Sequence, residues 1–132
     1  MKYDEFIKHV QNEAGLSSRD EAINATRATL ETIRERIVGD EAKDLASQLP
    51  KELGEYLHGR EGENGAYFKC DEFIKKVSER EGVSTEVATK HARAIFSVLE
   101  SAVSAGEFED VRLNFSDDYS EILPAVKNEV NA

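Results

Sequence analysis

The chain has 132 residues, of which 39% are hydrophobic and 33% are charged, and its 27 acidic residues against 17 lysines and arginines give a net charge of −10. This length fits one ordinary domain or two very small ones, with enough apolar residues for a core that needs neither metal nor disulfide. The acidic balance argues against nucleic acid and anionic membranes as partners, because phosphate contacts require concentrated basic side chains.

Signals for export or membrane insertion are not expected in this chain. No apolar run approaches the ~18 residues that a membrane-spanning helix needs, and the first residues lack the basic-then-apolar layout of a signal peptide. The single cysteine, Cys70, cannot form an intramolecular disulfide, which agrees with a reducing compartment. We therefore expect a cytoplasmic protein without membrane contact.

Two halves of the chain resemble each other in register. Asp-Glu-Phe-Ile-Lys-His-Val at 4–10 reappears at 71–77 as Asp-Glu-Phe-Ile-Lys-Lys-Val. Further matches follow in the same order: Arg27 with Arg93, Glu41 with Glu107, and Asp44 with Asp110. We interpret these matches as a tandem duplication of a unit of roughly 60 residues, with repeats at 1–58 and 69–132 and a linker at 59–68.

The apolar spacing within each unit is helical. Tyr3, Phe6, Ile7, Val10 and Ala14 recur at intervals of three and four residues, the pattern of an amphipathic helix. For the first unit the pattern predicts helices at 3–14, 18–38, 41–47 and 50–58. For the second unit it predicts helices at 69–81, 85–104, 107–113 and 117–130, the last of them kinked or interrupted by Pro124.

Glycines mark the expected ends of these helices. Gly15 and Gly82 suit the ends of the first helix in each unit, since glycine adopts left-handed dihedrals without a Cβ clash. Gly39 and Gly106 are expected to end the long second helices in the same way.

A capping signal precedes the first long helix, where Ser17 or Ser18 is followed three residues later by Asp20 or Glu21. The predicted fold class is therefore all-α, a tandem duplication of a four-helix unit. Each unit alone buries little apolar area, so the two should pack into one compact bundle. This packing is expected to use the long second helices together with Phe6, Ile7, Phe73 and Ile74.

Three segments carry a family resemblance: Asp-x-Phe at 4–6, Arg-Ala-Thr-Leu at 27–30, and Glu-Ala-Lys-Asp-Leu-Ala-Ser-Gln-Leu-Pro-Lys-Glu-Leu at 41–53. Together they resemble the bacterial and archaeal family named domain of unknown function 2267. The resemblance covers nearly the whole chain, although Phe115-Ser116 replaces the Leu49-Pro50 dipeptide in the second unit. It implies two related helical units, and it implies no activity, because the family has no agreed catalytic residues.

Nucleophile and phosphate-binding motifs are absent from the sequence. Cys70 has no histidine at a helical neighbour position to activate it, so a partly buried packing role is expected. No Gly-x-Ser-x-Gly turn and no glycine-rich phosphate loop occurs. We therefore expect a protein that is not an enzyme.

The histidines also lack the spacing that places two metal ligands on one helix face. His9 is expected to be exposed and His91 to pack half-buried beside the second long helix. A metal site formed by His58, Glu61 and Glu63 is the less favoured alternative, because glycine-rich loops preorganise ligands poorly. The prediction is a protein without cofactor or metal.

One polar pattern occurs in both units. Arg27 and Asp44 of the first unit correspond to Arg93 and Asp110 of the second. We expect each arginine to pair with its aspartate, or with another acid of the neighbouring helix, and so to tie the second helix to the third. The alternative is an arginine available for an anion or an acidic partner.

Two functional hypotheses follow from these observations. The first is a non-catalytic interaction or scaffold module that binds a protein partner or a second copy of the chain. The second is a small-molecule-binding protein, or a weak enzyme, with a cleft between the units near His91 and Arg93. A junction filled by aromatic side chains would favour the first, and a concave polar junction the second.

Overall fold

Helices make up all the regular structure of the computed structural model, which describes residues 1–126, and no strand occurs within that range. The first half contains α1 (Tyr3–Ala14), α2 (Arg19–Arg36), α3 (Gly39–Ser47), α4 (Lys51–Gly54) and the 3-10 helix η1 (Glu55–Leu57). The second half contains α5 (Cys70–Glu81), α6 (Thr85–Ala102), α7 (Ala105–Arg112) and the 3-10 helix η2 (Asp117–Glu121). The predicted all-α fold is confirmed. None of the described helices is long and apolar enough to cross a membrane.

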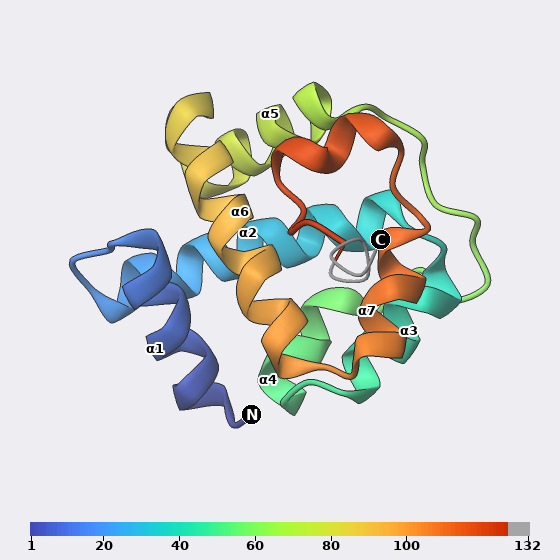
Figure 1. Cartoon of the computed structure of the whole chain (residues 1–132), viewed down its shortest axis with the longest axis horizontal. Coiled ribbons are helices and arrows are strands. Elements are labelled where there is room, and N and C mark those ends of the chain that lie inside the picture. The colour runs from blue at the N-terminus through green and yellow to red at the C-terminus, as the bar shows by residue number, and fades with distance from the viewer. Residues whose placement is uncertain (127–132) are drawn as a thin grey trace.

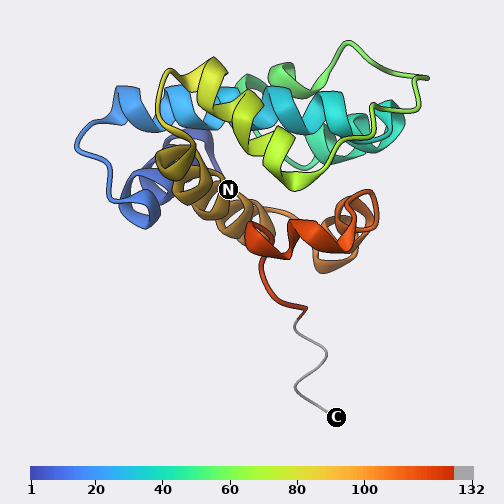
Figure 2. The same cartoon turned by 90° about the horizontal axis from the view of Figure 1, so that it is seen from above.

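The long helix α2 runs through the centre of the molecule (Figure 1). It packs against α1, α5 and α6, and these four helices form the main bundle. The short helices α3, α4 and η1 gather with α7 beyond one end of this bundle (Figure 2). Because α1 also packs on α6 and α5 on α2, each half of the chain covers a long helix of the other half.

The core is continuous from the main bundle to the short helices. As predicted, Phe6, Ile7, Phe73 and Ile74 are buried. Burial of a side chain of this size contributes about 1.5–3 kcal/mol, so the core supplies most of the driving force for folding. The ring of Phe73 lies at the centre of an aromatic group that also contains Phe68, Phe96, Phe115 and Tyr119.

Local signals at the helix ends act as the sequence predicts. Gly15 and Gly82 end α1 and α5 with φ of 64° and 80°. Ser18 is the N-cap of α2, and its hydroxyl accepts a hydrogen bond from the Glu21 amide at 3.1 Å. The Glu21 carboxylate in turn accepts hydrogen bonds from the hydroxyls of Ser17 and Ser18, which hold the pKa of Glu21 below its ordinary value.

The predicted role of Gly39 and Gly106 is wrong. The helix α2 ends at Arg36, Gly39 is the first residue of α3, and Gly106 lies in the first turn of α7. Gly39 is needed for a different reason, because a Cβ atom there would lie 1.6 Å from the carbonyl oxygen of Arg60. The close approach lets the Gly39 amide donate to the carbonyl oxygen of Glu63 at 2.8 Å, which fastens residues 60–63 to the start of α3.

Two predicted helices differ from those observed. The helix predicted at 50–58 divides into α4 and η1. The helix predicted at 117–130 is wrong in its described part, since η2 ends at Glu121 and residues 122–126 are not helical. Pro124 lies in this segment, where its missing N–H cannot continue a helix. Residues 127–130 lie outside the described part of the chain.

Candidate functional site

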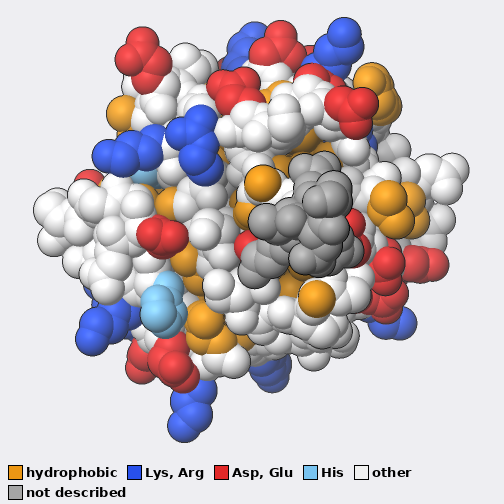
Figure 3. Space-filling model, viewed as in Figure 1, with side chains coloured by type: hydrophobic (Ala, Val, Ile, Leu, Met, Phe, Trp, Pro, Cys, Tyr) orange, Lys and Arg blue, Asp and Glu red, His pale blue; other side chains and the backbone are white. Residues whose placement is uncertain are grey.

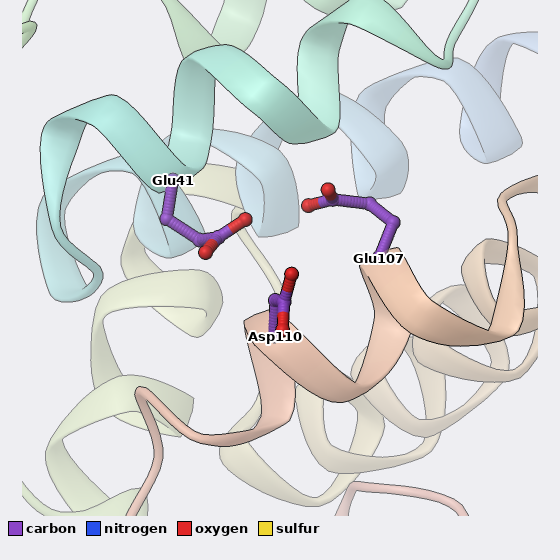
Figure 4. A group of neighbouring side chains, drawn as sticks. All are labelled: Glu41, Glu107 and Asp110. Carbon is purple, nitrogen blue, oxygen red and sulfur yellow. The ribbon is translucent and has the colours of Figure 1, made fainter.

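Three carboxylates converge where α3 packs against α7, and Figure 4 shows them pointing toward one another. Glu41 comes from the first turn of α3, and Glu107 and Asp110 come from α7. Their oxygen atoms lie within 4.8 Å of one another. We call Glu41, Glu107 and Asp110 the carboxylate cluster.

The cluster contains a buried carboxyl group without a basic partner. Glu107 is only 9% exposed, and the Oε2 atoms of Glu107 and Glu41 are buried without a hydrogen-bond partner. Within residues 1–126, no lysine, arginine or histidine forms an ion pair with any member of the cluster. Burial, a hydrogen bond with the Glu41 side chain and the fields of Glu41, Asp44 and Asp110 raise the pKa of Glu107 to about 8. Such a group is stabilised by a shared proton or by a cation.

The neighbouring junction between the two halves is occupied by Arg36, the last residue of α2. Its side chain is buried, and Nε donates to the carbonyl oxygen of Phe68 at 2.9 Å and to the Tyr119 hydroxyl at 3.2 Å. Its Nη1 donates to the carbonyl oxygen of Asn114 at 2.8 Å. The guanidinium also lies 4.9 Å from the ring centroid of Tyr67. Arg36 therefore fastens α2 to the segment that precedes α5 and to the segment that follows α7.

Burial makes the polar groups beside Arg36 resistant to ionisation. Burial, together with the smaller effect of the Glu121 and Asp118 carboxylates, raises the pKa of the Cys70 thiol to about 12. Burial also raises the pKa of Tyr119, whose hydroxyl donates to the carbonyl oxygen of Phe68 at 2.7 Å. Cys70 is 3% exposed, so it is buried more completely than the partly buried packing role predicted for it.

Three exposed hydrophobic residues lie within two positions of the junction residues Arg36, Phe68 and Asn114. Val38, Tyr67 and Leu113 are 41%, 70% and 80% exposed. The Val38 amide donates a hydrogen bond to the side chain of Asn114, which follows Leu113 in the chain. Arg36 donates to the carbonyl oxygen of the same Asn114, and its guanidinium lies against the ring of Tyr67. We call Val38, Tyr67 and Leu113 the apolar patch.

The structure gives Arg27 partners other than Asp44, so the pairing predicted from the sequence is not found. Its guanidinium donates to Oε1 of Glu31 at 2.8 Å, one turn along the same helix. It also donates to Oδ1 of Asn24 and to the carbonyl oxygen of Arg80 in α5. Arg27 therefore lies where α2 meets α5.

The second predicted pair is not found either. Arg93 is exposed, and its Nε donates to the carbonyl oxygen of Glu121 at 3.0 Å. Asp110 belongs to the carboxylate cluster, and Asp44 lies close enough to raise the pKa of Glu107. The physical reason is that α3 and α7 pack against each other, which turns their acidic residues toward one another rather than toward the arginines.

The histidine His91 is buried, and its Nδ1 lies 2.5 Å from Oε2 of Glu81. Burial raises the pKa of Glu81, and the interaction with His91 offsets part of this shift. His9 is exposed, as predicted. His9 therefore has the surface position expected from the sequence, whereas His91 has the expected packing role but is buried rather than half-buried.

The less favoured metal site does not gather its residues. His58 is exposed and its Nδ1 lies 3.9 Å from Oε1 of Glu61. Glu63 forms an ion pair with Arg60 at 3.3 Å instead. Among the described residues, the group with ligand atoms close enough for a metal is the carboxylate cluster.

The surface near the predicted cleft is only shallowly hollowed. Two hollows of about 220 Å³ and 280 Å³ lie between α1 and α6, and both include Glu13 and Ser97. Arg93 borders the second hollow, whereas buried His91 borders neither. These volumes fall below the about 300–1,000 Å³ of typical ligand sites.

The chain matches one known protein family. The model of the family described as "Uncharacterized conserved protein (DUF2267)" matches residues 3–122. The chain belongs to DUF2267. The matched range begins with the first residue of α1 and includes every described helix, so the resemblance inferred from the sequence is confirmed. No curated protein matches the chain.

The sequence of this DUF2267 chain carried a signal for the carboxylate cluster. Glu41 with Asp44 and Glu107 with Asp110 show the same Glu-x-x-Asp spacing, which places both acids of a pair on one helix face. The repeat aligns these residues between the two units, but only the two aspartates were predicted to have a role, as ion-pair partners of the arginines. It missed the cluster because the contact between α3 and α7 is a tertiary feature that the spacing does not specify.

Proposed function

We propose that this chain is a non-catalytic protein-interaction module of the cytoplasm, built from two related helical units at 1–58 and 69–132. Support for the two units comes from their matching elements. Each begins with a 12-residue helix that a left-handed glycine ends, followed by an 18-residue helix with a serine N-cap. The unpaired Cys70 supports the compartment, since it is compatible with reducing conditions.

The observation that carries the proposal is the closed junction between the units. Arg36 of the first unit fills it, with its guanidinium 5.5 Å and 5.3 Å from the ring centroids of Phe115 and Tyr119 in the second unit. These two rings pack on Phe73 of the same unit. This junction joins the two units through packed side chains. It holds the two units in one fixed relation, which suits a rigid binding surface.

The apolar patch is the proposed contact surface, and its partner is a protein with an apolar centre and a basic rim. An exposed acid lies close in sequence to two residues of the patch: Asp40 follows Val38, and Asp110 precedes Leu113, each within three residues. The chain as a whole carries a charge of −10, which disfavours contact with a second copy. Figure 3 shows acidic groups beside isolated hydrophobic side chains on one face of the molecule.

The test compares affinity capture by the wild-type chain, the variant Leu113→Glu and the control Val87→Glu. Val87 is also an exposed hydrophobic residue, but it lies in the first turn of α6. We expect a basic protein that the wild type and the control retain in low salt and that the Leu113 variant loses. Retention of the same proteins by all three chains would contradict the proposal, and a wild-type dimer that Leu113→Glu dissociates would make a second copy the partner.

The hollows between α1 and α6 support the small-molecule alternative only weakly. A ligand there would contact Glu13, Ser97 and Arg93, which offer hydrogen bonds and one positive charge. The alternative predicts an organic compound bound to the protein purified from its native cell. Intact-mass measurement under non-denaturing conditions would detect such a compound.

A further inference from the structure

We propose that the carboxylate cluster of Glu41, Glu107 and Asp110 binds a divalent cation of the oxygen-seeking class, with Ca²⁺ as the first candidate. The proposal goes beyond the interaction function and does not depend on it. The cluster oxygens lie within 4.8 Å of one another. Oxygen ligands lie about 2.3–2.6 Å from Ca²⁺, so two ligands on opposite sides of the ion are separated by roughly twice that distance. The three side chains therefore already have the spacing of a cation's ligands.

A second observation points to a ligand rather than to a merely acidic surface. Glu107 is more than nine-tenths buried, its carboxylate points at Glu41, and its Oε2 has no hydrogen-bond partner (Figure 4). The Oε2 atom of Glu41 is also buried without a partner. Buried carboxylate oxygens ordinarily have partners, because desolvation without compensation is costly. A cation between α3 and α7 would satisfy both oxygens at once.

The donor set selects the class of metal. All three side chains offer carboxylate oxygens, and neither histidine nor cysteine belongs to the cluster. Hard cations such as Ca²⁺, Mg²⁺ and Mn²⁺ prefer such ligands, whereas Zn²⁺ prefers nitrogen and sulfur. Asp110 is exposed, which gives the ion a path from solvent and leaves room for water in its coordination shell. Asp44, one turn along α3 from Glu41, adds negative charge nearby.

The experiment titrates the whole chain, freed of metal with a chelator, with CaCl₂, MgCl₂, MnCl₂ and ZnCl₂ in separate calorimetric runs. We expect one Ca²⁺ per chain, with a dissociation constant between about 10⁻⁶ and 10⁻³ M. The variants Glu41→Gln and Glu107→Gln should weaken binding by about tenfold or more. The control Glu109→Gln removes the same charge from α7, but Glu109 pairs with Arg112 outside the cluster, so binding should be unchanged.

Two further measurements locate the ion and separate binding from folding. Amide chemical shifts should change on Ca²⁺ addition in α3 and α7 of the wild type. The melting temperature should rise with Ca²⁺ in the wild type and in Glu109→Gln, and should not respond in Glu107→Gln, which circular dichroism would show to be folded. Absence of binding by Ca²⁺, Mg²⁺ and Mn²⁺ at millimolar concentration, undiminished binding by Glu107→Gln, or binding of Zn²⁺ alone would each overturn the proposal.

Discussion

Arg36 and Glu107 are both buried ionisable residues, and neither forms an ion pair with an opposite charge within residues 1–126, yet their surroundings differ sharply. Arg36 donates to two carbonyl oxygens and a hydroxyl and lies among aromatic rings. Glu107 has a buried oxygen without any partner and carboxylates for neighbours. A buried ionisable group whose hydrogen bonds are complete stabilises the fold, whereas one with an unpartnered oxygen can bind a ligand. The completeness of hydrogen bonding therefore distinguishes the two roles, and the charge of the group does not.

The two sites join the two halves of the chain through different segments and with opposite sign. Arg36 comes from the first half and draws in Asn114 and Tyr119 of the second half. Glu41 and Glu107 come from the two halves and repel each other when both are ionised. One contact between the halves is therefore permanently attractive, and the other depends on a proton or a cation.

The largest effect is expected from Arg36→Leu. The substitution leaves the carbonyl oxygens of Phe68 and Asn114 and the hydroxyl of Tyr119 without this donor, and each unsatisfied buried group costs about 1–3 kcal/mol. We expect the free energy of unfolding to fall by about 2–4 kcal/mol in urea denaturation. Arg34→Leu is the matched control, because Arg34 makes a single longer bond of 3.4 Å to the His58 carbonyl. Equal losses in the two variants would show that Arg36 is not the fastening residue.

The carboxylate cluster should respond in the opposite direction. In the presence of a chelator at pH 7.5, Glu107→Gln replaces a buried carboxyl among carboxylates by a neutral amide that donates to Glu41. We expect the free energy of unfolding to rise by about 1–3 kcal/mol. Glu109→Gln, the same change on α7 outside the cluster, should not raise it. Destabilisation by Glu107→Gln would mean that its carboxyl group has a structural partner.

The pH dependence of stability sharpens the same contrast. Because the pKa of Glu107 is about 8 in the folded chain and that of an ordinary glutamate is 4.5, the folded state retains a proton that the unfolded state has lost. Stability without divalent cations should therefore fall as pH rises from 4.5 to 8, by at most about 1.4 kcal/mol per pH unit for this group, and level off above.

The difference between the wild type and Glu107→Gln isolates this contribution. Burial also raises the pKa of Glu81, but Glu81 is present in both chains and cancels in the difference. Glu35 has a lowered pKa because Arg80 and Lys76 outweigh its burial, and it therefore acts below pH 4.5, outside this window. Parallel pH profiles in the two chains would contradict the assignment to Glu107.

The sequence predicts what depends on local signals and fails where tertiary contacts decide. The range 3–14 coincides with α1 because its apolar spacing and Gly15 are both local. The role of Gly39 was missed because it depends on Arg60, a residue far along the chain. The buried position of Arg36 was missed for the same reason, since its partners Phe68 and Asn114 lie beyond any helical spacing. The cluster itself required the contact between α3 and α7.

The smallest effects are expected at the two repeated arginines, where the comparison is between partial and full exposure. Arg27 has a side chain 31% exposed, an i,i+4 ion pair with Glu31 and a bond to the Arg80 carbonyl, so Arg27→Leu should lower the free energy of unfolding by about 1 kcal/mol. Arg93 is exposed and makes one bond to the Glu121 carbonyl, so Arg93→Leu should change it by less than about 0.5 kcal/mol. A double-mutant cycle of Arg27→Leu with Glu31→Gln measures the ion pair directly. A loss at Arg93 as large as that at Arg27 would show that exposure does not set their contributions, and would favour a bound anion or partner at Arg93.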